Sequence, residues 1–119
     1  MPSGQVEQRA HVLSTPEEVD AFLAQHPDCV LFKAGSCHRT DNALENLEAI
    51  LGARTDIPVG LIRVVEARSA SQRVAERTSV RHASPQVILI HAGRVVHARD
   101  NWDISRQAIE QALAEHFTA

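Results

Sequence analysis

The sequence predicts an α/β fold, with a mixed sheet of four to five strands and helices on both faces. Three features indicate it. Apolar runs of strand length alternate with amphipathic segments of helical length. The run 29–34, CVLFKA, is apolar almost throughout, as in a central strand buried on both faces. The last two runs, 86–90 and 94–99, are so close in sequence that they are expected to pair antiparallel, which makes the sheet mixed.

Length and composition indicate an ordinary globular protein. The chain has 119 residues, 44% hydrophobic and 23% charged, and we expect a single domain over residues 1–119. The net charge is -3 with both signs interspersed, so nucleic acid is not an expected partner. No run approaches the roughly 18 apolar residues of a membrane span, and residues 1–14 lack an apolar signal-peptide core. We therefore expect a cytoplasmic protein with no membrane partner. We also expect a monomer.

The N-terminal third is expected to contain a short strand, a helix and a buried strand. Residues 5–13, QVEQRAHVL, give the short strand. Residues 14–25 begin with two hydroxyl residues, then Pro16 and two glutamates, as at a helix start. One face of this helix carries Val19, Phe22 and Leu23. The segment His26-Pro27-Asp28 ends the helix before the buried strand 29–34.

The middle of the chain predicts a β-α-β unit followed by another helix. A helix begins near Ser36 or Cys37 and ends at Gly52, and its apolar positions are Ala43, Leu44, Leu47, Ile50 and Leu51. Residues 57–67 then form a strand parallel to strand 29–34. A helix from about Ser69 to Arg77 follows, with Val74 facing inward and Ser69 or Ser71 as its cap.

The C-terminal third predicts a hairpin and a final helix. The strands QVILI and RVVHAR are separated by His-Ala-Gly. The final helix has Asp103 as its N-cap and an apolar stripe of Ile104, Ala108, Ile109, Ala112 and Leu113. A β-α-β half followed by a β-β-α half is the order of a thioredoxin-like fold.

The two cysteines differ in their expected roles. Cys37 lies where the buried strand gives way to a helix, and the free N–H groups and dipole of a helix N-terminus lower the pKa of a thiol. His38 and Arg39 add positive potential there, while Asp41 opposes them. Cys29 lies at the far end of an extended strand, beyond the roughly 7 Å reach of a disulfide, and we interpret it as a buried packing residue.

Thr40 occupies the position at which dithiol oxidoreductases carry a second cysteine. The motif CHRT is therefore Cys-x-x-Thr. A hydroxyl one turn along the helix can donate a hydrogen bond to the thiolate, but it cannot resolve a mixed disulfide. We predict Cys37 and Thr40 as catalytic residues, with a separate thiol resolving the intermediate.

Pro85 precedes the buried strand QVILI. In a thioredoxin-like fold this is the place of a cis-proline loop, which packs against the active cysteine. Ser84 and Pro85 would there offer a backbone edge to an extended thiol substrate. Only about 5% of X–Pro bonds are cis, so the expectation rests on the fold context.

Several segments resemble the monothiol bacilliredoxins, small thioredoxin-like proteins of bacteria that use bacillithiol instead of glutathione. The matching pieces are LFKAGSC, VVEARSASQRVAERTSVRHASPQVILIHAGRVV and NWDISRQAIEQAL, which cover most of residues 30–113. RHASPQVILI and WDI are the more specific ones. The family usually reads Thr-Cys-Pro-Ile-Ser around its thiol, so His38 replaces a proline here and puts a titratable group in its place.

The resemblance implies an enzyme that removes bacillithiol from S-bacillithiolated client proteins. Cys37 would attack the bacillithiol sulfur, and free bacillithiol, a thiol co-substrate, would restore the thiolate. No bound cofactor is expected. Bacillithiol carries a malate group, so substrate-binding candidates are the cationic or polar residues His38, Arg39, Arg81 and His82. Trp102 either flanks this site or packs in the core at the start of the last helix.

Two other functions fit the same residues. One is a glutaredoxin-like protein that transfers a different low-molecular-weight thiol, and the other is a non-catalytic redox sensor or scaffold with a modifiable Cys37. A metal site is not expected, because the seven histidines form no recognised ligand spacing with the cysteines. The glycine-rich signature of iron–sulfur monothiol glutaredoxins is absent from the sequence after Cys37.

Overall fold

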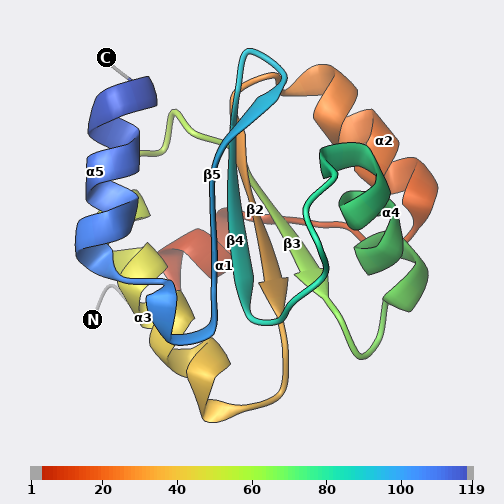
Figure 1. Ribbon diagram of the computed structural model, residues 1–119, viewed down its shortest axis with the longest axis horizontal. Coiled ribbons are helices and arrows are strands. Elements are labelled where there is room, and N and C mark those ends of the chain that lie inside the picture. The colour runs from red at the N-terminus through yellow and green to blue at the C-terminus, as the bar shows by residue number, and fades with distance from the viewer. Residues whose placement is uncertain (1–3, 118–119) are drawn as a thin grey trace.

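A five-stranded mixed sheet with helices on both faces organises residues 4–117, which the computed structural model describes (Figure 1). The predicted thioredoxin-like arrangement of the sheet is confirmed, and the strand order is β1-β3-β2-β4-β5. The elements are α1 Gln5–Arg9, β1 His11–Val12, α2 Pro16–Gln25, β2 Cys29–Ala34, α3 His38–Leu51, β3 Val59–Arg63, α4 Arg68–Thr78, β4 Gln86–His91, β5 Arg94–Asp100, the short 3-10 helix η1 Asn101–Asp103, and α5 Arg106–His116.

Strand β2 lies at the centre of the sheet. It pairs parallel with β3 and antiparallel with β4, and five of its six residues are buried. This agrees with the apolar pattern of its sequence. Strands β4 and β5 form the predicted hairpin, whose two turn residues, Ala92 and Gly93, both have positive φ, 53° and 78°. Such a turn matches the twist of the paired strands.

The helices form a layer on each face of the sheet (Figure 1). Because strand side chains alternate, Phe32 of β2 joins the core beneath α1, α3 and α5, whereas its neighbour Leu31 joins the core beneath α2 and α4. The longest described helix, α3, has 14 residues. No helix within residues 4–117 has the length and apolar character to cross a membrane.

The predicted strand over residues 5–13 was mostly wrong. Residues 5–9 form helix α1, and only His11–Val12 pair as a strand with β3. A contact distant in sequence explains the helix. The backbone N–H groups of Val6 and Glu7 donate to the Glu48 carboxylate of α3, at 2.8 and 3.2 Å. This carboxylate binds free donors of the helix N-terminus, and no pattern within residues 5–13 reveals it.

Two predicted helix caps were also wrong. Helix α4 begins one residue earlier than expected, after Ala67, and no side chain caps it. Helix α5 is capped by Ser105, whose hydroxyl accepts from the Ala108 N–H at 3.1 Å, while Asp103 belongs to the 3-10 turn before it. Ile104 has φ -81° and ψ 84°, and Ser105 is extended, so neither residue belongs to the helix and it cannot begin as early as predicted. Strand β3 is shorter than the predicted 57–67.

Candidate functional site

Cys37 is the N-cap residue of α3, at the edge of the sheet where β2 ends. Its backbone is extended, with φ -104° and ψ 170°, and its carbonyl accepts from the Thr40 N–H at 2.9 Å. The residue is partly exposed and its thiol is free. The loop from β2 into α3 occupies the lower edge of Figure 1, beside the loop that leads into β4. The thiol is therefore placed where an external disulfide can reach it.

The surroundings of Cys37 lower the pKa of its thiol. Burial of the sulfur opposes ionisation, but the backbone N–H groups of Thr40 and Arg39, with the hydrogen bond and charge of the Arg39 side chain, outweigh it. This is the direction expected for a cysteine at a helix N-terminus. More of the thiol is therefore present as the nucleophilic thiolate near neutral pH.

The thiol of Cys29, in contrast, has a raised pKa. It is fully buried on β2, and burial, together with the neighbouring Asp28 carboxylate, raises the pKa of its thiol to about 12. Its interpretation as a packing residue is confirmed. At neutral pH only Cys37 offers a nucleophilic sulfur.

Thr40 contributes to the site differently from the prediction. Its hydroxyl is buried and accepts from the Gly35 N–H at 3.0 Å. Among residues 4–117, no hydrogen bond joins this hydroxyl to the Cys37 sulfur, so the predicted hydroxyl–thiolate bond is not found; Thr40 acts on the thiol through its backbone N–H. The hydroxyl instead ties the loop before Cys37 to the first turn of α3.

The loop before Cys37 touches the loop before β4. The Ser84–Pro85 bond is cis, as the fold context predicted, and Pro85 is buried. A Cβ placed on Gly35 would lie 3.2 Å from the Ser84 Oγ and 3.3 Å from the Thr40 Oγ1. Glycine at position 35 therefore permits the loop of Ser84 to approach the loop before Cys37 and the first turn of α3.

Trp102 is not a core residue. It lies on η1 with 64% of its surface exposed. The N–H of the preceding residue, Asn101, donates to the Pro85 carbonyl at 2.9 Å, so η1 is attached to the cis-proline loop. The structure thus excludes the core position expected for Trp102 and attaches the neighbouring Asn101 to the cis-proline loop.

His38 and Arg39 follow Cys37 and are both exposed. His38 Nδ1 lies 4.0 Å from an Asp41 carboxylate oxygen, and both side chains are almost entirely in solvent. Such a pair contributes little to stability. His38 is free to contact a substrate, and Arg39 is the cation that acts directly on the Cys37 thiol.

His82 belongs to a polar cluster on the opposite face of the sheet from α3. Its Nδ1 lies 3.1 Å from the Nζ of Lys33 and 3.2 Å from the Oγ of Ser71. Burial, and then the charge of Lys33, lower the pKa of His82. At neutral pH the imidazole is uncharged, so it can offer a substrate a hydrogen bond but no positive charge. Among the described residues, no hydrogen bond or ion pair joins His82 to Cys37.

Lys33, the only lysine of the chain, is fully buried on β2. Burial lowers the pKa of its amine from about 10.5 to about 8. It pairs across the sheet with Gln86, whose side-chain amide donates to the Arg81 carbonyl at 2.9 Å. Lys33 and Gln86 thus hold the two ends of the exposed Arg81–His82 segment. Lys33 was not among the predicted site residues, although a lysine in an otherwise apolar strand is a detectable signal.

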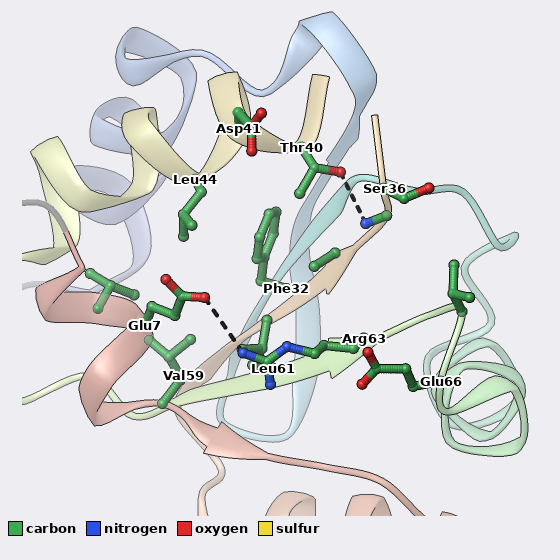
Figure 2. Close-up of a pocket in the computed structure, with 15 residues that line it drawn as sticks. Glu7, Phe32, Ser36, Thr40, Asp41, Leu44, Val59, Leu61, Arg63 and Glu66 are labelled. Atoms are coloured by element: carbon green, nitrogen blue, oxygen red, sulfur yellow. Dashed lines mark hydrogen bonds and ion pairs between the residues drawn. The ribbon is translucent and has the colours of Figure 1, made fainter. Parts of the chain in front are cut away.

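A cavity of about 420 Å³ opens beside the thiol loop (Figure 2). Phe32, Leu44 and Leu61 form part of its apolar wall, and Ser36 and Thr40 line it next to Cys37. Its charged lining residues are Glu7, Asp41, Arg63 and Glu66. Local patterns could not predict this cavity, because the residues come from α1, β2, α3, β3 and the loop after β3.

These features define a class of protein. A thiol of lowered pKa at a helix N-terminus, beside a cis-proline on a thioredoxin-like sheet, is the site of a thioredoxin-like thiol–disulfide oxidoreductase. Residues 11–109 match the family described as Monothiol bacilliredoxin BrxC. The chain belongs to this family.

Solved structures agree with this classification. One, described as a thioredoxin-fold protein and provisionally as an oxidoreductase, is 26% identical, with a TM-score of 0.80 over 90% of this chain and 96% of that one. The oxidised mitochondrial thioredoxin 3 of Saccharomyces cerevisiae is 16% identical, with a TM-score of 0.72 over 93% and 98% of the two chains. Fasciola hepatica thioredoxin is 17% identical, with a TM-score of 0.70 over 89% and 98%. The two thioredoxins support the fold alone.

Proposed function

We propose that the protein removes bacillithiol from S-bacillithiolated proteins through a mixed disulfide on Cys37. The observation that carries the proposal is the isolation of this thiol. Cys37 is ionisable and accessible, whereas Cys29 is buried with a raised pKa and Thr40 stands where a resolving cysteine would be. A lone thiolate suits exchange with an external low-molecular-weight thiol, and membership of the monothiol bacilliredoxin family favours bacillithiol as that thiol.

The reaction consists of two thiol–disulfide exchanges. The Cys37 thiolate attacks the bacillithiol sulfur, the disulfide breaks, and the client leaves as a thiolate that takes a proton from solvent. Bacillithiol is then bound to Cys37. The thiolate of a second bacillithiol molecule then attacks the sulfur of the bound bacillithiol. This step releases bacillithiol disulfide and restores the Cys37 thiolate. Bacillithiol is a co-substrate in this scheme, and no bound cofactor is required.

The remaining predicted residues have separate roles in the proposal. Arg39 stabilises the thiolate, and the backbone at Ser84–Pro85 aligns the extended substrate beside it. Arg39 and Arg81 supply charge to the malate carboxylates of bacillithiol, and His38 and His82 supply hydrogen bonds. Trp102 contacts the substrate from the side of η1.

A transfer assay tests the proposal. The protein is incubated with a peptide carrying a bacillithiol mixed disulfide and, separately, with the same peptide carrying glutathione. Peptide release is followed by mass spectrometry. We expect faster release from the bacillithiol substrate, loss of release in Cys37→Ser and normal release in Cys29→Ser. Equal rates for the two substrates would indicate a general thiol-transfer protein, and no release from either would indicate a non-catalytic redox sensor.

A further inference from the structure

The cavity described above adjoins the loop that carries Cys37. Gly35 and Ser36, the two residues before the thiol, line it, as does Thr40 one turn after the thiol. Figure 2 shows Ser36 and Thr40 above Phe32, at the side of the cavity where β2 leads into α3. A group that occupies this cavity is therefore a near neighbour of a disulfide that reacts with Cys37.

The interior of the cavity is apolar. Phe32 and Leu61 come from neighbouring strands, and Leu44 comes from α3 above them (Figure 2). Ligand sites in proteins commonly span about 300–1,000 Å³, so a cavity of about 420 Å³ accommodates a small group. One long aliphatic side chain is an occupant of suitable size and polarity.

The charged residues of the cavity carry a net negative charge. Glu7, Asp41 and Glu66 are acidic and Arg63 is the single cation among the lining residues. Arg63 already lies 3.5 Å from Glu7, so its charge is partly neutralised within the protein. The exposed carboxylates of Asp41 and Glu66 are left to attract a cation.

We infer that this cavity binds a side chain of the client protein, next to the modified cysteine, that has an aliphatic stem and a positively charged end. Lysine is the simplest such side chain, because its stem packs on apolar surface while its ammonium group stays at the rim. The malate of bacillithiol has the wrong charge for this cavity. The inference rests on the proposed function. It assigns the client side chain to the cavity and the malate of bacillithiol to the surface that carries Arg39 and Arg81.

Three peptides that differ at the residue beside the cysteine test this inference. The residue is lysine, norleucine, which has the same stem without the charge, or glutamate, on either flank in turn. Each peptide is prepared as its bacillithiol mixed disulfide, and the second-order rate of peptide release is measured with the full-length protein. We expect lysine to react fastest, by roughly two- to fivefold over norleucine, and glutamate slowest, as for an exposed charge pair.

Two variants with the same change of net charge locate the effect. Glu66→Lys reverses a charge at the cavity, and Glu110→Lys reverses one on the exposed face of α5. We expect Glu66→Lys to abolish the lysine preference and Glu110→Lys to preserve it. Equal rates for lysine and glutamate peptides in the wild-type protein, or equal effects of the two variants, would overturn the inference.

A second series separates this inference from the proposed function. The same peptides are joined to thionitrobenzoate, whose disulfides react with any accessible thiolate; Cys37 attacks the peptide sulfur and coloured thionitrobenzoate leaves. A lysine preference here, without release of peptide from the bacillithiol disulfides of the first series, would refute the proposed function and support the cavity. Release of peptide from the bacillithiol disulfides with no lysine preference in either series would support the proposed function and refute the cavity.

Discussion

At the scale of single residues, the thiol of Cys37 determines the chemistry, and its acidity depends on a few neighbouring groups. The N–H groups of Thr40 and Arg39 belong to the backbone of α3 and persist in any variant that folds. The Arg39 side chain is the part of this environment that substitution can remove. Its contribution is therefore directly measurable.

We predict that Cys37 reacts with iodoacetamide with an apparent pKa below the value of about 8.5 for free cysteine. The rate rises with pH as the thiolate forms. Arg39→Gln removes a cation and a hydrogen-bond donor, so it should move the midpoint to higher pH and slow the reaction below the midpoint by roughly two- to fivefold. Arg94→Gln, an exposed change in the hairpin, is the control and should leave the profile in place.

Gly35 provides a steric test of the contact between the two loops. In Gly35→Ala the new methyl group lies 3.2 Å from the Ser84 Oγ and 3.3 Å from the Thr40 Oγ1, so both hydroxyls must move. We predict a loss of about 1–3 kcal/mol in the free energy of unfolding. Disulfide exchange should slow, while iodoacetamide alkylation changes little. Ser36→Ala, at the exposed neighbouring position, is the control. If Gly35→Ala lowers the free energy of unfolding no more than Ser36→Ala does, the close contact of Gly35 with Ser84 and Thr40 does not stabilise the fold.

At the scale of elements, the sequence predicts those elements whose signals are local. The apolar run of β2, the Thr15 cap and Pro16 of α2, and the short connection between β4 and β5 each give the observed element. Helix α1 and the start of α5 could not be predicted in the same way. The first depends on Glu48 of another helix, and the second on the non-helical backbone of Ile104 and Ser105.

The hairpin turn contains a local conflict that substitution can relieve. Ala92 has a φ of 53°, a conformation that alanine adopts at a cost and asparagine tolerates better. We predict that Ala92→Asn raises the free energy of unfolding by about 0.5–1 kcal/mol in urea denaturation. Ala114→Asn, at an exposed position of α5, should lower it, because asparagine is a poorer helix former. A loss of stability in Ala92→Asn would contradict the role given to this turn.

At the scale of the whole molecule, the sequence predicts the sheet and the position of the thiol but not the surfaces around it. The site requires β2, α3 and the cis-proline loop to meet at one edge, which follows from the order of elements. The cavity and the Lys33–His82 contact combine side chains from elements far apart in the chain. Their formation depends on packing, which hydrophobic periodicity does not describe.

The buried amine of Lys33 should make global stability depend on alkaline pH. Its pKa is about 8 in the folded protein, below the value of about 10.5 in the unfolded chain. Between these values the unfolded chain holds a proton that the folded protein has released, so stability from this group rises with pH, by up to about 3 kcal/mol. Below pH 8 the amine is protonated in both states, so the contribution of Lys33 to the free energy of unfolding does not change with pH.

Comparison of wild type with Lys33→Met by urea denaturation between pH 7 and 10 isolates this effect. The chain has no tyrosine, and Cys37 titrates in both proteins, so the difference between the two curves reports Lys33. We predict a difference that grows with pH. Because Lys33 is the only lysine, NMR of selectively labelled lysine also measures its titration directly. A midpoint near 10.5 would contradict the burial of a charged amine.

The most direct test of the central claim is to identify which half of the mixed disulfide remains on Cys37 after one turnover. The Cys29→Ser variant is mixed with an equimolar bacillithiolated peptide without free bacillithiol, quenched with acid and weighed intact by mass spectrometry. We predict an increase equal to one bacillithiol on Cys37 and release of the reduced peptide. An increase equal to the peptide, with bacillithiol released instead, would contradict the proposed reaction.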